Sequence, residues 1–226
     1  MNTIIRVQNY CWTNSILLTF IKKLYFDLQT PYFTCKLIIQ MELISFLNSI
    51  YKISDDSSIE LEKISQLINF PKNSLIQDIG SSCKTIYIIH SGCARIFYDK
   101  DGTDITEHFA FKNELIVRAE SLFTGKPTSK GIQAIDDTFI WAIDSLKLFS
   151  LYDIHHDLER LFRLLFEREY VNTTRRIESL QFKTAKERYL ELLDTTDYVQ
   201  KIPLKYIATY LGITQVSLSR IRAEIT

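Results

Sequence analysis

The chain has 226 residues, 46% of them hydrophobic and 24% charged, which is typical of a globular protein and excludes a disordered or collagen-like chain. Its 27 Lys and Arg residues are balanced by 27 Asp and Glu residues, so net charge gives no support for nucleic-acid binding. Any basic surface that binds nucleic acid must therefore be local.

Residues 1–40 differ in pattern from the rest of the chain. The apolar run at 15–21 is too short to cross a bilayer, and Lys22 and Lys23 follow it, which is the reverse of a secretory signal. A clear helical pattern begins at Met41. We interpret residues 1–40 as a weakly structured extension upstream of the native start, with an amphipathic surface helix as the alternative.

Residues 41–153 form the next predicted unit, a β-roll with flanking helices. The 41–69 segment reads as helix, with one apolar face at Leu43, Phe46, Leu47 and Ile50 and another at Ile59, Leu61, Ile64, Leu67 and Ile68. Strand patterns follow at 75–79, 85–90, 93–98, 103–111, 130–135 and 138–143. Ser91-Gly92 and Asp101-Gly102 are hairpin-type turns between them. Short strands in this number predict a small barrel, sandwich or roll.

A long helix is expected over 154–182, after a shorter helical start near Ser145. Its apolar residues form two adjoining stripes, one at Leu158, Leu161 and Leu165 and the other at Phe162, Phe166, Tyr170, Ile177 and Leu180. A stripe this broad needs two surfaces to pack against. We predict that one is the β-unit and the other a second copy of the helix, with Leu158, Leu161, Leu165 and the polar register residue Asn172 in a homodimer interface. The alternative is that both stripes pack within one chain.

The last unit, 183–226, ends in a helix-turn-helix pattern. Ala208 is small enough for close crossing of two helices, Gly212 can take the left-handed conformation that ends the first, and Thr214 can cap the second. Leu218 and Ile221 then seal the angle between them. This spacing predicts that the second helix enters a DNA major groove, with an ordinary helical hairpin as the alternative.

The predicted recognition helix assigns roles to individual side chains. Arg220 can bind guanine through O6 and N7, Gln215 can read adenine, and Val216 can touch a thymine methyl group. The remaining candidate DNA-binding residues, for base or phosphate contacts, are Thr214, Ser217, Ser219, Arg222, Lys205, Tyr206 and Thr209. The sequence stops at Thr226, so we expect the β-hairpin wing that often follows this motif to be reduced or absent.

The order of β-roll, long helix and helix-turn-helix resembles the Crp/Fnr family of bacterial transcription regulators, over residues 41–226. The most specific matches are Pro203, Tyr206, Ile207, Ala208, Leu211, Gly212, Leu218, Ser219, Arg220, Ile221 and Arg222. The segment 184–189 is similar to Bacteroidetes-type members. The resemblance implies an α+β fold with an antiparallel, cyclic-nucleotide-binding-like β-roll. It also implies a cytoplasmic homodimer, without membrane association, that binds palindromic double-stranded DNA and acts through RNA polymerase.

The resemblance also locates a candidate effector site at 118–130. Cyclic-nucleotide-binding members hold the phosphate with a Gly-Glu turn and an arginine about ten residues later, because a phosphodiester requires N–H donors and a guanidinium. Here Ala119 precedes Glu120, and Thr128-Ser129 stands where the arginine is expected. We therefore predict that cAMP is not the ligand, and that a different small effector or none binds. The candidate ligand residues are Arg118, Glu120, Ser121, Lys126, Thr128 and Ser129.

Metal and catalytic chemistry are not expected. The four cysteines, at 11, 35, 83 and 93, form no Cys-x-x-Cys pair, and His90 and His108 lie in different strand patterns. Signatures of hydrolases, P-loops and dinucleotide-binding enzymes are also missing from the sequence. The remaining alternative to a DNA-binding regulator is a ligand-binding or interaction module whose helix-turn-helix does not bind DNA.

Overall fold

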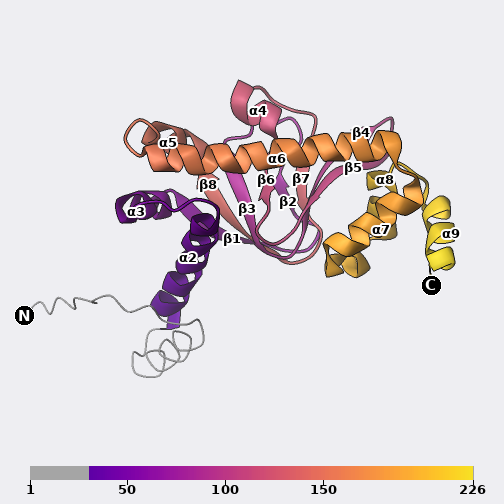
Figure 1. Cartoon of the computed structure of the whole chain (residues 1–226), viewed down its shortest axis with the longest axis horizontal. Coiled ribbons are helices and arrows are strands. Elements are labelled where there is room, and N and C mark those ends of the chain that lie inside the picture. Colours follow the sequence, from indigo (N-terminus) through magenta and orange to yellow (C-terminus); the bar gives the residue numbers. More distant parts are fainter. Residues whose placement is uncertain (1–30, 226) are drawn as a thin grey trace, which may run out of the picture. The chain divides into compact units, whose positions relative to one another are not determined.

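The computed structural model describes residues 31–225, with side chains described from Met41 onward (Figure 1). Residues from Leu43 onward form one compact unit. Helix α2 spans Pro31–Ile50, so the boundary expected at residue 41 falls inside a continuous helix. The rest of the predicted extension, residues 1–30, lies outside the described residues.

Residues 43–70, the first part of the compact unit, agree with the sequence prediction in α2 and differ from it after α3. Leu43 and Leu47 of α2 are buried, as predicted. Helix α3 (Asp55–Lys63) begins after Ser54, whose hydroxyl accepts a hydrogen bond from the Ser57 amide. The prediction that helix continues to residue 69 is wrong, because Ser65–Phe70 is strand β1 and pairs along its whole length with strand β8. Tertiary pairing here overrides the local periodicity.

The β-roll consists of two four-stranded sheets, both antiparallel where their pairing is described. One sheet has the order β1, β8 (Thr138–Asp144), β3 (Thr85–Ser91) and β6 (Leu115–Ile116). The other has the order β2 (Leu75–Gln77), β7 (Gly131–Ala134), β4 (Ala94–Lys100) and β5 (Thr103–Ala110). Apolar side chains from both sheets form the core, including Ile89, Ile96, Ile132 and Ile140. The predicted antiparallel β-roll is confirmed.

Local chemistry explains two of the turns. Asp101 and Gly102 both have positive φ angles, 53° and 79°, which is the geometry of a tight hairpin turn and gives the β4–β5 hairpin that Asp-Gly predicts. Gly92, before β4, has a φ of 93°, and a Cβ there would approach the Asp137 carbonyl oxygen to 2.7 Å. Only glycine therefore fits that close crossing.

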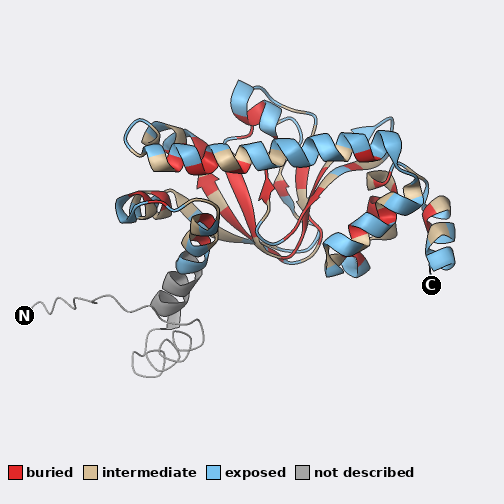
Figure 2. Cartoon of the chain, viewed as in Figure 1, coloured by how far each residue is buried: buried red, intermediate tan, exposed pale blue. Residues whose placement is uncertain are grey.

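Helices α5 (Ser145–Leu151) and α6 (His156–Phe182) follow the roll, as predicted. Leu158, Leu161 and Leu165 of α6 are fully buried within the single chain (Figure 2). The prediction that these leucines line a dimer interface is therefore wrong, because the chain itself already covers them. The apolar side chains that α6 leaves exposed lie further along it, and Tyr170 is 75% exposed and Ile177 51%.

The C-terminal helices have the expected order. Helix α7 (Ala185–Thr195) starts with a capping box between Thr184 and Glu187, and a short 3₁₀ segment, η1 (Asp197–Lys201), follows it. Helices α8 (Leu204–Tyr210) and α9 (Gln215–Ile225) form the helix-turn-helix. Gly212 has a φ of 70°, and Ala208 and Leu218 are buried where the helices cross. None of the helices in the described part of the chain is long and apolar enough to cross a membrane.

Candidate functional site

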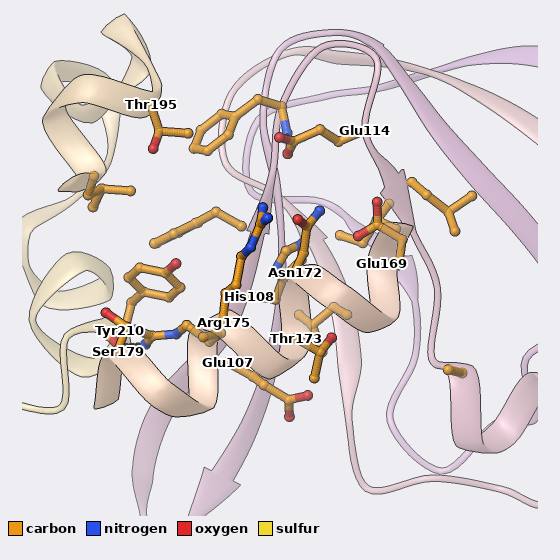
Figure 3. A pocket seen from close by; sticks show the side chains of 18 of the residues that line it. Glu107, His108, Glu114, Glu169, Asn172, Thr173, Arg175, Ser179, Thr195 and Tyr210 are labelled. Carbon is orange, nitrogen blue, oxygen red and sulfur yellow. Dashed lines mark hydrogen bonds between the residues drawn. The ribbon is translucent and has the colours of Figure 1, made fainter. Parts of the chain in front are cut away.

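A cavity of about 870 Å³ lies between the β-roll, α6 and the C-terminal helices. Its walls come from β5, from the segment that joins β6 to helix α4 (Ala119–Thr124), and from the middle and end of α6. Residues of α7 and Tyr210 of α8 close one end (Figure 3). The cavity therefore contacts both the roll and the helices that carry the candidate DNA-binding residues.

Arg118 lines this cavity but is a structural residue. The side chain is buried, and its guanidinium donates to Gln77 Oε1 at 3.1 Å, to the Asp78 carbonyl oxygen at 3.0 Å and to the Lys130 carbonyl oxygen at 2.5 Å. A further hydrogen bond goes to Ser81 Oγ. These acceptors join loops of the roll to one another. In this structure the Arg118 donors serve the fold, so its predicted ligand role stays a prediction that no contact here supports.

Ser121 is also used internally. Its hydroxyl donates to the Lys126 carbonyl oxygen and accepts a hydrogen bond from the Cys83 amide at 2.8 Å. The predicted ligand role of Ser121 likewise stays a prediction, with its hydroxyl used inside the β-roll in this structure. Glu120, Lys126 and Ser129 are exposed, and Glu120 and Thr128 line the cavity while Lys126 and Ser129 do not.

The place where a phosphate-binding arginine is expected contains an internal ion pair instead. Lys130 Nζ lies 2.5 Å from Glu107 Oε2 on β5, and both residues line the cavity. The Glu107 carboxylate therefore offsets the charge of the lysine that follows Thr128-Ser129 in the sequence. The prediction against cAMP stays a prediction.

The centre of the cavity holds titratable groups with perturbed pKa values. Burial raises the pKa of the Glu114 and Glu169 carboxyl groups. Burial of its imidazole, with the positive charge of Arg176 nearby, lowers the pKa of His108 to about 4. Glu114, Glu169, His108 and Asn172 are labelled around the cavity in Figure 3. Asn172 thus lies at the cavity wall, whereas the sequence predicted a dimer seam.

Helix α9, the predicted recognition helix, exposes the side chains predicted for base contact. Gln215, Val216, Ser219 and Arg220 are exposed on α9, and Val216 is 61% exposed although it is apolar. Thr214 caps this helix by accepting a hydrogen bond from the Ser217 amide at 3.2 Å. Lys205 and Arg222 are also exposed. All of these positions are compatible with the predicted DNA surface.

Two predicted phosphate contacts face the β-roll instead. Tyr206 is only 7% exposed, and the Arg95 guanidinium lies 3.6 Å from its ring centroid. Thr209 Oγ1 accepts a hydrogen bond from the Thr106 amide of β5 at 3.1 Å. Because α8 packs on β5 in this conformation, Tyr206 and Thr209 contact the β-roll, and their predicted role at the DNA backbone stays a prediction.

Arg95 is a residue that sequence reasoning missed. The side chain is 1% exposed and forms a bidentate pair with Asp104, with N–O distances of 2.6 and 2.7 Å. It also donates to Thr106 Oγ1 and Gln133 Oε1 and packs on the Phe97 ring. The sequence did carry a signal for Arg95, which stands between an alanine and an isoleucine in a strand pattern. An arginine buried in a strand needs polar partners, so such a position predicts an internal ion pair.

The part of the chain that the structure describes contains no group of three or more His, Cys, Asp or Glu residues able to hold a metal ion. Cys83 and Cys93 are buried and free, and burial raises the pKa of the Cys93 thiol beyond its ordinary range. These thiols are therefore packing residues.

Comparisons with known proteins bear on the fold. Residues 67–155 match the family model for the cyclic nucleotide-binding domain. FixK2 from Bradyrhizobium japonicum is similar in structure, with a TM-score of 0.62, 20% identity, and coverage of 72% of this chain and 84% of that chain. A proposed Crp/Fnr-family transcriptional regulator from Eubacterium rectale has a TM-score of 0.60 and 18% identity, with coverage of 76% and 83%. The chain has the Crp/Fnr fold.

A third structure extends this likeness. The c-di-GMP-responsive global regulator CLP from Xanthomonas campestris has a TM-score of 0.60 and 14% identity, with coverage of 76% of this chain and 91% of that chain. A search of curated protein sequences found no match. The predicted resemblance is thus confirmed at the level of the Crp/Fnr fold.

Proposed function

We propose that the protein is a DNA-binding transcriptional regulator of the Crp/Fnr type. The observation that carries the proposal is the exposed face of α9, where Val216, Ser219 and Arg220 project from a helix-turn-helix with its caps and buried crossing in place. An exposed valine beside an arginine suits a major groove, where thymine methyl groups and guanine edges lie side by side.

The regulator would act as a cytoplasmic homodimer on a palindromic operator and control transcription through RNA polymerase. Support for the dimer is an apolar row on one face of α6 at helical spacing, in which Tyr170 and Ile177 are exposed and Phe166 is half-buried. Phe123 of α4 extends the row, with its ring centroid 5.2 Å from that of Phe166. This surface replaces the leucines that the sequence suggested.

The sensor would respond to a small effector other than cAMP. Arg118 is committed to the fold, and the Lys130–Glu107 pair leaves little positive charge where a cyclic phosphate would sit. Solved structures with this fold include a global regulator and a proposed transcriptional regulator, which supports a signalling role.

A second candidate is a ligand-binding or interaction module whose helix-turn-helix does not bind DNA. The packing of α8 on β5 favours it, because Tyr206 is buried and the Thr209 hydroxyl already accepts a hydrogen bond from the Thr106 amide.

DNA binding by the full chain separates the two candidates. Selection from a random duplex library should recover palindromic sites, which fluorescence anisotropy can then compare with unrelated duplexes. Arg220→Ala should weaken specific binding by about 1–3 kcal/mol and relax one base position. Arg220→Lys is the matched variant, because it retains the charge and loses the bidentate fork. It should lose specificity while nonspecific affinity stays close to wild type. Failure to recover any duplex at low salt would favour the non-DNA-binding module.

A further inference from the structure

Arg176 of α6 and Arg188 of α7 lie at the end of the cavity next to the helix-turn-helix. Arg176 Nη2 donates to the Tyr210 carbonyl oxygen, and its guanidinium lies 3.8 Å from the Tyr210 ring centroid. Arg188 Nη2 donates to the Leu211 carbonyl oxygen at 2.8 Å. Because these acceptors belong to adjacent residues at the end of α8, the two guanidinium groups lie close together.

The carboxylates near this pair of positive charges form no ion pair with it in the described part of the chain. Among the residues that the structure describes, neither Arg176 nor Arg188 forms an ion pair. Glu191 is the carboxylate that acts on Arg176 from α7, but it is held by Lys183 Nζ and by Ser179 Oγ, the latter at 3.2 Å. Burial and the nearby charge of Arg188 lower the pKa of Arg176, as expected for two guanidinium groups sharing one site.

Each arginine also has a donor that the protein does not use. The Nε atoms of Arg176 and Arg188 are buried and donate to no acceptor in the described part of the chain. A buried donor on a charged group is costly to leave without a partner, and guanidinium donors are best satisfied by carboxylate or phosphate oxygens. Solvent does not reach the Nε atoms, so an anion would meet the two guanidinium groups where their side chains line the cavity.

We propose that Arg176 and Arg188 form an oxyanion subsite that takes a phosphate or carboxylate group of a small effector. The subsite is separate from the β6–α4–β7 segment, where Arg118 is already occupied. It goes beyond the proposed DNA-binding function and does not depend on it. Because the same guanidinium groups hold the last carbonyl oxygens of α8, an anion bound there acts directly on the position of the helix-turn-helix.

Thermal unfolding of the full chain in sodium phosphate and in sodium acetate, with ionic strength kept constant by sodium chloride, tests the subsite without DNA. The midpoint should rise with the oxyanion, because a ligand that binds only the folded state stabilises it. A rise in phosphate alone identifies phosphate chemistry, and a rise in both identifies a general oxyanion site. No rise in either salt overturns the proposal.

Arg176→Met and Arg188→Met should each weaken the apparent affinity by about tenfold or more, the value of one charge-assisted hydrogen bond. Arg160→Met is the matched control, because Arg160 is an exposed arginine of the same helix whose described contact is the Tyr51 ring. It should bind like wild type. If the methionine variants do not fold, Arg176→Lys and Arg188→Lys keep the charge and remove the Nε donor, and should also weaken binding. Unchanged affinity in the folded variants overturns the assignment.

Discussion

Buried arginines connect strands and loops of the β-roll. Arg95 reaches Asp104, Thr106 and Gln133, while Arg118 reaches the loops around Asp78 and Lys130. A guanidinium can join several segments because its five N–H donors lie in one plane and the group stays charged when it is buried. Arginines that keep donors free of such internal contacts are the better ligand candidates. In this cavity these are Arg176 and Arg188 rather than Arg118.

Replacement of Arg118 should affect stability rather than effector binding alone. Arg118→Met leaves the Asp78 and Lys130 carbonyl oxygens and the Gln77 amide oxygen without their donor, and each buried group left unsatisfied costs about 1–3 kcal/mol. Urea denaturation should show a loss of at least about 2 kcal/mol. Lys126→Met, at an exposed site on the same segment, should stay within about 0.5 kcal/mol of wild type. Equal stability of both variants would return Arg118 to the ligand candidates.

His108 should make stability fall on mild acidification. Its pKa is lowered from 6.5 to about 4 in the folded protein, so the unfolded chain binds more protons between these values. Stability then decreases as pH falls through that window, by up to about 1.4 kcal/mol per pH unit. The raised pKa values of Glu114 and Glu169 act in the opposite direction, so the informative quantity is the difference between variants.

His108→Gln should flatten the profile of unfolding free energy between pH 6.5 and about 4, measured by urea titration. His156→Gln, at an exposed position on α6, should keep the wild-type profile. Identical profiles for wild type and His108→Gln would show that the imidazole titrates normally in the folded state.

At the scale of elements, α6 has two different halves. Its first half is buried by the chain through Leu158, Leu161 and Leu165, and its second half leaves Tyr170 and Ile177 exposed. An exposed apolar row on a helix of this length costs solubility unless a partner covers it. The proposed dimer therefore depends on the second half of the helix.

Ile177→Glu should convert the proposed dimer to a monomer, because a carboxylate buried at an apolar interface has no partner. Sedimentation equilibrium over a range of protein concentrations measures this directly. Thr103→Glu adds the same single negative charge at an exposed, neutral position of the β-roll and should leave the association constant unchanged. A wild-type protein that remains monomeric at the highest concentration would remove α6 as an interface.

Elements with strong local signals could be predicted from the sequence, whereas those that depend on partners could not. The Asp101-Gly102 hairpin and the Gly212 helix end follow from residues that tolerate positive φ. The sequence predicts helix for β1, because its apolar residues match helical spacing. Only pairing with β8 makes this segment a strand. The short strand β6 and helix α4 carry too few residues for a period to emerge.

At the scale of the whole compact unit, the candidate site depends on contacts between segments far apart in sequence. The exposed face of α9 was predictable because local caps and spacing fix it. The contacts of Tyr206 and Thr209 with the β-roll were not predictable, since the Thr106 amide donates to Thr209 Oγ1 across a separation of 103 residues. For the same reason no local pattern could bring Arg176 and Arg188 to one end of a cavity.

Tyr206 and Thr209 cannot contact a phosphate while α8 is packed on β5. The hydrogen-exchange rate of the Thr106 amide distinguishes the two arrangements. The Thr106 N–H donates to Thr209 Oγ1, so it is protected while α8 is packed on the strand. If bound DNA takes the hydroxyl of Thr209, exchange of the Thr106 amide should quicken by about tenfold, the worth of one hydrogen bond, while amides of α9 slow. Hydrogen exchange followed by NMR, with and without a selected duplex, measures both.

The variant Thr209→Val lacks the acceptor, so its Thr106 amide should exchange quickly already in the free protein and respond little to DNA. Unchanged protection of the wild-type Thr106 amide at saturating DNA would mean that α8 stays on β5. Sequence-specific contact would then rest on α9 alone, with Lys205, exposed at the start of α8, as the one predicted phosphate contact of that helix still accessible. In that case Tyr206→Phe should leave DNA affinity unchanged, since its hydroxyl would never reach a phosphate.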